Sequence, residues 1–145
     1  MELKVKTFKE LTTYELYEIL RARETVFLLE QRIVCQDKDR ADYDALHCFL
    51  EENGSLVAYL RACPTENGVK LGRVLTLRRG EGLGSRLMEG SIPEIMRHFN
   101  TDKLYIHAQK HAEGFYSRHG FVTTSPEFDE EGVPHVSMSL ICSEK

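Results

Sequence analysis

The chain has 145 residues, 41% of them hydrophobic, and a formal net charge of −4 at pH 7. This length predicts one domain, residues 1–145, with a sizeable buried core. Positive and negative residues are interspersed without a basic stripe, which argues against nucleic acid as a partner. No apolar run reaches the roughly 20 residues that span a bilayer, and the N-terminus lacks the apolar core of a signal peptide. We therefore expect a soluble, cytoplasmic protein with no membrane partner.

The N-terminal part predicts a strand followed by a helix. Residues 2–8 form the expected strand. Thr12 and Glu15 have the spacing of a capping box, in which the side chain of each residue accepts a hydrogen bond from the backbone N–H of the other at the start of a helix. Apolar residues follow at helical spacing as far as Phe27, which predicts that the helix continues to that point.

The next part predicts a three-stranded meander over residues 45–77. Residues 45–52 and 55–63 are apolar-rich runs, and Asn53-Gly54 between them accepts the positive φ angles of a type I′ hairpin turn. A second turn then leads into a strand over residues 70–77. The pairing within this meander should be antiparallel.

The C-terminal half predicts alternating helices and strands. Apolar residues from Leu83 to Phe99 follow one helical stripe, and Pro93 is expected to kink or divide this helix. The remaining expected elements are a strand over residues 104–108, a helix over 111–119 closed by Gly120, and two last strands over 121–125 and 135–141. The resulting order, β-α-β-β-β-α-β-α-β-β, describes an α/β fold.

Residues 77–88 form a glycine-punctuated loop between the meander and the following helix. Gly80, Gly82 and Gly84 let the backbone turn tightly and approach a ligand closely, and the free N–H groups that open the helix attract an anion. A mononucleotide P-loop is excluded because Ser85-Arg86 stands where lysine and a hydroxyl residue are needed. A dinucleotide site would need a third glycine at Ser85. The loop therefore predicts a phosphorylated ligand of another class.

The loop resembles the pyrophosphate-binding loop of the GNAT superfamily of acyl-CoA-dependent N-acetyltransferases. The matching pattern is Arg79-x-x-Gly82-x-Gly84. Other segments occur in the order that the superfamily uses and look like its ElaA-like branch: residues 23–31, residues 37–47, Ala108-Gln109, residues 115–121 and residues 129–135. The resemblance thus extends over nearly the whole chain.

The resemblance implies a GNAT-type fold, a mixed and mostly antiparallel central sheet with splayed middle strands, flanked by helices. It also implies acetyl-CoA as co-substrate and direct transfer of the acetyl group to a primary amine in a ternary complex. Strand residues before the loop would pair with the pantetheine arm and polarise the thioester carbonyl, and loop N–H groups would hold the pyrophosphate. The implied cofactor-binding residues are Val74, Leu75, Thr76, Arg79, Gly80, Glu81, Gly82, Leu83, Gly84, Ser85 and Tyr116.

Tyr116 is the residue that we expect to act as general acid. A phenol with a pKa near ~10 is protonated at neutral pH and can donate to a departing thiolate, and the family has a tyrosine at this position. The general base is left open between Glu30, His47 and His135, with His107 ranked below them. Each of the three could equally be a hydrogen-bonded structural residue.

No metal site is expected. Asp37-x-Asp39-x-x-Asp42 resembles the start of a calcium loop, but the later ligand positions do not fit, so we expect a solvated acidic loop. His107 and His111 are four residues apart, but the expected change from strand to helix between them spoils a shared face. The four scattered cysteines predict free, buried thiols.

Two other functions are kept as alternatives. One is a non-catalytic module on the same fold that binds acyl-CoA or a protein partner, and the other is nucleotide binding through the glycine loop. The sequence leaves open the identity of the amine acceptor, the range of acyl groups and the oligomeric state, for which a homodimer is one option.

Overall fold

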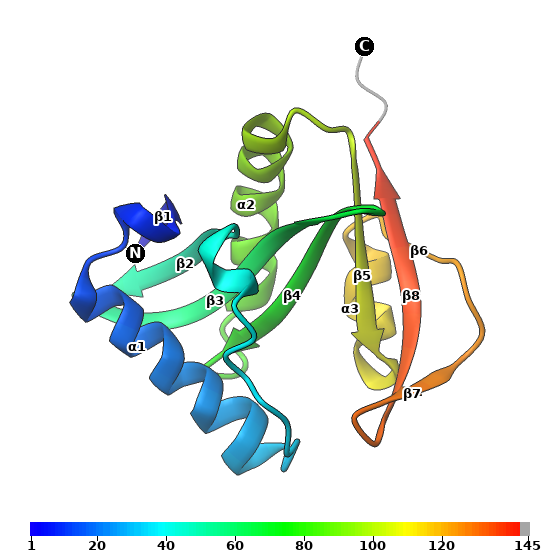
Figure 1. Cartoon of the computed structure of the whole chain (residues 1–145), viewed down its shortest axis with the longest axis horizontal. Coiled ribbons are helices and arrows are strands. Elements are labelled where there is room, and N and C mark those ends of the chain that lie inside the picture. The colour runs from blue at the N-terminus through cyan, green and yellow to red at the C-terminus, as the bar shows by residue number, and fades with distance from the viewer. Residues whose placement is uncertain (143–145) are drawn as a thin grey trace.

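The computed structural model describes residues 1–142, so the last three residues of the expected domain lie outside the described part (Figure 1). In chain order the elements are β1 (Glu2–Thr7), α1 (Thr13–Arg23), β2 (Leu46–Glu52), β3 (Ser55–Thr65), β4 (Gly68–Thr76), α2 (Leu83–Phe99), β5 (Lys103–Gln109), α3 (Glu113–Arg118), β6 (Val122–Thr123), β7 (Phe128–Glu130) and β8 (Val133–Ile141). A π-helix covers Glu24–Glu30, and short 3₁₀ turns cover Phe8–Glu10, Ala41–Tyr43 and Lys110–Ala112.

The strands form one mixed sheet in the order β1-β2-β3-β4-β5-β8-β6, with β7 paired to β8. All these pairs are antiparallel except that of β4 and β5, which is parallel. These two strands pair only over residues 69–71 and 104–106, and beyond this point they diverge. Figure 1 shows the resulting V-shaped opening between the two halves of the sheet. The expected mixed sheet with splayed middle strands is confirmed.

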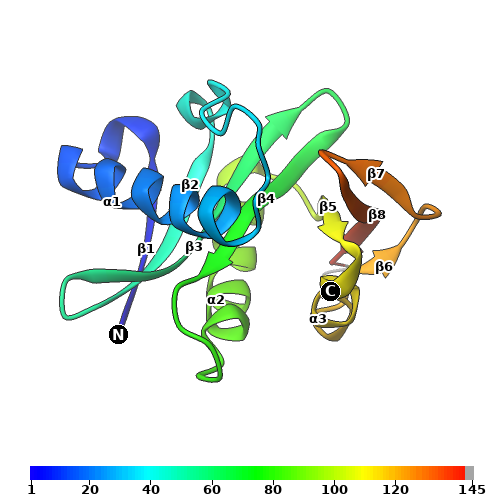
Figure 2. The same cartoon turned by 90° about the horizontal axis from the view of Figure 1, so that it is seen from below.

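Helices cover both faces of the sheet (Figure 2). On one face, α2 inserts Leu87, Met88 and Ile95, which are fully buried, into the larger of two apolar clusters. On the other face, α1 packs Ile19 against Tyr59 of β3 in the smaller cluster. Removal of these side chains from water is the main force that holds each helix on the sheet.

Several local signals in the sequence correspond directly to the structure. The Thr12 hydroxyl accepts a hydrogen bond from the Glu15 N–H at 3.0 Å, and the Glu15 carboxylate accepts one from the Thr12 N–H at 2.9 Å. The expected capping box is therefore confirmed. Asn53 and Gly54 both have positive φ, at 53° and 81°, as a type I′ turn requires. The predicted antiparallel meander of β2, β3 and β4 is also confirmed.

Pro93 does not divide its helix, because α2 is assigned as one helix from Leu83 to Phe99. A proline removes the N–H group that would bond to the carbonyl four residues earlier, here that of Glu89. Glu89 and Pro93 both lie on the exposed side of α2, so water can bind the freed carbonyl. The proline therefore removes one backbone hydrogen bond of the helix at a place where water can replace it.

Two other expectations about elements are wrong. The first helix was expected to remain regular to Phe27, but the α-helical part ends at Arg23 and the π-helix follows. The last part of the chain contains three strands instead of two, because the short β7 forms a hairpin with β8 that the pattern did not indicate. The alternation of apolar and polar residues in β7 extends over only three residues, which is too short for a pattern to register.

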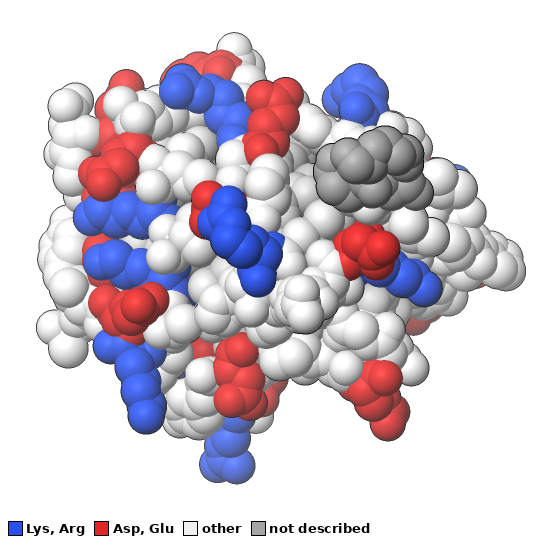
Figure 3. Space-filling view, turned by 90° about the horizontal axis from the view of Figure 1, so that it is seen from above, with Lys and Arg blue, Asp and Glu red and all other residues white. Residues whose placement is uncertain are grey.

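The surface mixes charges of both signs. On the face in Figure 3, basic and acidic side chains are intermingled among uncharged residues. The four cysteines are free, but only Cys48 is buried, while Cys35 and Cys142 are exposed. This corrects the expectation that all the thiols are buried. Within residues 1–142, no helix is both long and apolar enough to cross a bilayer.

Candidate active site

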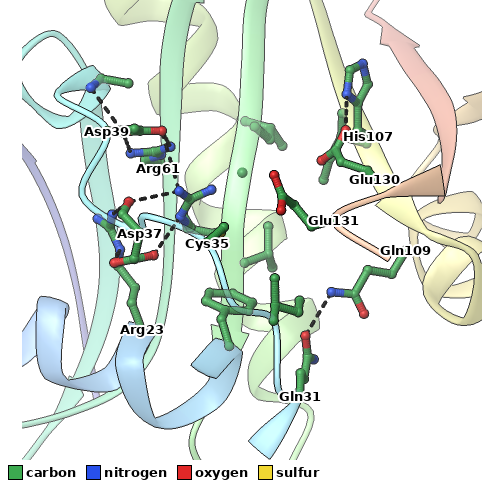
Figure 4. A pocket seen from close by; sticks show the side chains of 18 of the residues that line it. Arg23, Gln31, Cys35, Asp37, Asp39, Arg61, His107, Gln109, Glu130 and Glu131 are labelled. Carbon is green, nitrogen blue, oxygen red and sulfur yellow. Dashed lines mark hydrogen bonds and ion pairs between the residues drawn. The ribbon is translucent and has the colours of Figure 1, made fainter. Parts of the chain in front are cut away.

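A cleft of about 1020 Å³ lies at the divergence of β4 and β5. Its lining comes from α1 and the segment that follows it, from β3, β4 and β5, from the turn between β7 and β8, and from Tyr116 of α3. Figure 4 shows charged and polar side chains on both of its walls. Elements that are distant in the sequence thus contribute to one cavity.

The edge of β4 that faces the cleft is unpaired over its second half. Pairing with β5 ends at Leu71, so residues 72–76 have no strand partner on that side within residues 1–142. Val74 lines the cleft. The side chain of Leu75 is buried in the cluster under α1, and Thr76 is partly buried. An unpaired edge can accept an extended ligand by backbone hydrogen bonds, in the manner of an added strand.

The glycine loop connects this edge to α2. Gly80 and Gly82 have φ angles of 78° and 70°, a conformation that residues with a Cβ atom rarely adopt. Gly82 is also the N-cap residue of α2, and it offers no side chain to cap the helix. The N–H groups of the first turn, from Leu83 to Ser85, have no partner within the helix. These donors and the positive end of the helix dipole can hold an anion there.

The first turn of α2 lies against α3. A Cβ atom built on Gly84 would stand 3.1 Å from Cζ of Phe115, so a glycine permits this close approach. Next to it, Ser85 Oγ is 3.1 Å from His119 Nε2, within hydrogen-bond distance. These contacts fix the helix that carries Tyr116 beside the end of the glycine loop.

Tyr116 is only 6% exposed and lines the cleft from the side of α3. Its ring packs edge-on against Phe115 and Phe121. Burial raises the pKa of the phenol above its usual value, because the charged phenolate would lose its hydration. The hydroxyl is therefore protonated at neutral pH.

One wall of the cleft contains Arg23, Arg61 and Arg73 together with Asp37 and Asp39. We call these residues, with Asp42, which pairs with two of the arginines, the ion-pair wall. Asp42 accepts from Arg23 Nη1 at 2.7 Å and from Arg61 Nη1 at 2.9 Å. The carboxylate of Asp39 accepts from Arg61 Nη2 at 2.7 Å. The expectation of a solvated acidic loop is therefore wrong for Asp42, which is 6% exposed. The Asp39 side chain is 39% exposed, but it too is paired with a buried arginine.

The arginines lower the pKa values of two carboxyl groups in this wall. Burial alone would raise the pKa of Asp39, but the hydrogen bond and charge of Arg61, with the charge of Arg73, lower it to about 2. The pKa of Asp42 is lowered as well, because its hydrogen bonds and charge interactions with Arg23 and Arg61 outweigh its burial. The sequence could not indicate these pairs, because the three arginines lie on α1, β3 and β4.

The opposite wall, which we call the histidine wall, contains His107, Glu130, Glu131 and His135. His135 Nδ1 donates to the Val133 carbonyl at 2.8 Å, so the neutral ring carries its lone pair on Nε2. That Nε2 atom is 3.9 Å from Glu130 Oε2, and His107 Nδ1 is 3.0 Å from Glu130 Oε1. Glu130 therefore lies between two histidines, and Glu131 points into the cleft (Figure 4).

Sequence reasoning missed Glu130, Glu131 and the role of the turn that carries them. Glu131 and Gly132 have φ angles of 53° and 77°, the two positive values of a type I′ hairpin. The Glu-Gly pair was a weak signal for that turn, because glutamate is uncommon at positive φ. No pattern in the sequence indicates the hydrogen bond across the cleft from Gln109 Nε2 to Gln31 Oε1, at 2.9 Å (Figure 4).

Two of the three candidate bases lie outside the cleft lining. His47 is fully buried, and its Nε2 donates to the Asp42 carbonyl at 3.0 Å while its Nδ1 accepts from the Tyr59 hydroxyl at 2.7 Å. Burial lowers the pKa of His47 and favours the neutral ring. Glu30 lies at the glycine loop, with Oε1 3.6 Å from Arg79 Nη2. Only His135 of the three lines the cleft.

Side chains of the glycine loop point in different directions. The Arg79 side chain is 81% exposed, so its ion pair with Glu30 contributes little and leaves the guanidinium free to meet a phosphate. Glu81 forms an ion pair with Arg78 at 3.1 Å. Leu83 points into the core and anchors the first turn of α2. The backbone, more than the side chains, therefore determines what the loop can bind.

A splayed mixed sheet, an unpaired edge on β4 and an uncapped helix after a glycine loop define the fold of the acyl-CoA N-acyltransferases. Residues 11–142 match the family model described as an acetyltransferase (GNAT) domain. The chain belongs to the GNAT family. The fold and the branch that the sequence predicted are both confirmed by its relatives.

Among these relatives, protein ElaA of Escherichia coli is 33% identical over 137 residues, which cover 90% of each chain. The crystal structure of Escherichia coli ElaA superposes with a TM-score of 0.88 at 32% identity, covering 96% of this chain and 98% of ElaA. An acyl-CoA N-acyltransferase from Pseudomonas aeruginosa gives a TM-score of 0.90 at 34% identity, covering 97% and 99%. The PaiA N-acetyltransferase of Thermoplasma acidophilum, solved with coenzyme A, shares the fold at 14% identity and a TM-score of 0.67.

Proposed function

We propose that this protein transfers an acyl group, most simply acetyl, from its CoA thioester to a primary amine by direct attack in a ternary complex. The observation that carries the proposal is the buried, protonated Tyr116 hydroxyl in a cleft whose β4 edge is unpaired. The edge would hold the pantetheine arm as an added strand, and the N–H groups of residues 80–85 would hold the pyrophosphate. Arg79 would add a charge-assisted contact.

Proton transfer in this proposal uses both sides of the cleft. The amine must lose a proton as its nitrogen bonds to the carbonyl carbon, and the bond from carbon to sulfur breaks with release of a thiolate. Tyr116 would donate its proton to that sulfur. His135 would accept the amine proton on Nε2, since Nδ1 is already engaged with the Val133 carbonyl. We rank His135 above Glu30 and His47 because it alone lines the cleft.

The first test is release of free CoA thiol from acetyl-CoA in the presence of a panel of primary amines. We expect amine-dependent thiol release by the wild-type chain and a loss of about 10²-fold or more in kcat for His135→Asn. CoA binding without thiol release from any amine would instead support a non-catalytic module, and an unchanged kcat in His135→Asn would remove His135 from the mechanism.

Several finer points stay predictions. They are the acetyl group as the transferred acyl group, the primary amine as acceptor, the cytoplasmic location, the extent of the domain over residues 1–145 and the option of a homodimer. Acyl-CoA thioesters of different chain lengths in the same thiol assay would determine the acyl range.

A further inference from the structure

A β-bulge in β4 lies at the unpaired edge. β3 and β4 pair at Arg61 with Gly72 and again at Tyr59 with Leu75, so two residues of β4 oppose one residue of β3. Those two residues are Arg73 and Val74. Arg73 has a φ of 53°, a conformation that residues with side chains rarely adopt. The bulge therefore needs contacts elsewhere to maintain it.

Those contacts come mainly from Asp37. Arg73 Nε donates to Asp37 Oδ1 at 2.9 Å, and Arg73 Nη2 donates to the Asp37 carbonyl at 2.9 Å. A third, longer contact joins Arg73 Nη2 to Asp39 Oδ2 at 3.4 Å. A guanidinium held at two points has a fixed orientation, so the backbone to which it is attached is held as well.

Asp37 is itself held from the other side. Arg23 of α1 donates through Nε to Asp37 Oδ2 and through Nη2 to the Asp37 carbonyl, both at 3.0 Å. Arg23 is fully buried, so the packing around it fixes the orientation of its guanidinium group. Asp37 thus joins α1 to the bulge through two matching pairs of hydrogen bonds (Figure 4).

We propose that the Arg73–Asp37 ion pair is a positioning device that holds the β4 bulge so that the backbone at Val74 faces the thioester. The inference rests on the proposed function, because it assumes that an acyl-CoA thioester lies along this edge. Arg73 and Asp37 are positioning residues, since they act through the backbone of β4. Both residues lie in the ion-pair wall, so the pair joins the segment that follows α1 to β4 on one side of the cleft.

The test compares Arg73→Gln, Asp37→Asn and the double variant with wild type. The primary readout is the change in backbone amide chemical shift on addition of acetyl-CoA, followed at Val74 and at Gly82. In all three variants we expect most of the shift at Val74 to be lost while the shift at Gly82 persists. In the thiol assay, kcat should fall about 10- to 100-fold with little change in the Kd of CoA. The double variant should be no worse than either single variant.

The matched control is Glu51→Gln, which breaks a partly buried ion pair with Lys4 of 2.9 Å at the far end of the sheet. It should leave both shifts and kcat unchanged. An undiminished shift at Val74 in Arg73→Gln and Asp37→Asn would overturn the positioning role. Absence of any shift in the wild-type protein would instead overturn the proposed function. If one single variant fails to fold, the other gives the same comparison.

Discussion

Replacing Tyr116 by phenylalanine is expected to lower kcat by about 10²–10⁴-fold and to leave the Kd of CoA nearly unchanged. The substitution removes only the hydroxyl, because the ring contacts with Phe115 and Phe121 are kept. Without a proton donor, the thiolate must leave unprotonated, which raises the barrier of the chemical step alone. The thiol-release assay and a CoA titration measure the two quantities separately.

Tyr105→Phe is the matched control for this experiment. This variant likewise removes one phenol hydroxyl, which in the wild type lies 2.8 Å from the hydroxyl of Thr65. Tyr105 does not line the cleft. Its kcat should remain close to that of the wild type. An unchanged kcat in Tyr116→Phe would remove Tyr116 from the mechanism.

The largest expected effect on stability comes from Arg23→Ala, which should lower the free energy of unfolding by about 3 kcal/mol or more. The Arg23 side chain is fully buried and forms hydrogen bonds with Asp37 and Asp42. Its removal leaves buried carboxylate oxygens without these donors and creates a cavity in the ion-pair wall. Urea unfolding followed by circular dichroism gives the midpoint and the slope.

Arg21→Ala, two residues earlier on α1, is the comparison. The Arg21 side chain is 67% exposed and lies 3.9 Å from Glu18, so its loss should cost less than about 1 kcal/mol. Equal unfolding midpoints for the two variants would contradict the view that the ion-pair wall stabilises the fold.

The features that could be predicted from the sequence are those with short-range signals. The capping box at Thr12, the Asn53-Gly54 turn and the glycine loop each depend on residues within a few positions of one another. The fold class followed from the order of such elements together with the family pattern around Gly82. Tyr116 could be singled out because the resemblance attached a role to that position.

The features that could not be predicted depend on long-range pairing. Asp37 and Arg73 are 36 residues apart, and His107 and Glu130 are 23 apart, so no spacing connects them. From its sequence the acidic segment is expected to be unpaired and exposed, and only the arginines of other elements make Asp42 a buried residue and Asp39 a paired one. Hydrophobic pattern carries no information about which buried charges will meet.

We expect backbone N–H groups of the glycine loop to hold the pyrophosphate of CoA. Gly82→Val should strain the backbone, because valine rarely adopts a positive φ. A Cβ atom on Gly82 would meet no protein atom within 4 Å beyond its chain neighbours, so we expect the valine side chain to occupy the space where the pyrophosphate would bind. Calorimetric titration with CoA measures this interaction. We predict saturable binding by the wild type, binding weaker by about tenfold or more in Gly82→Val, and little binding of pantetheine, which lacks the pyrophosphate. No heat of association with CoA, or equal affinity for CoA and pantetheine, would contradict the account.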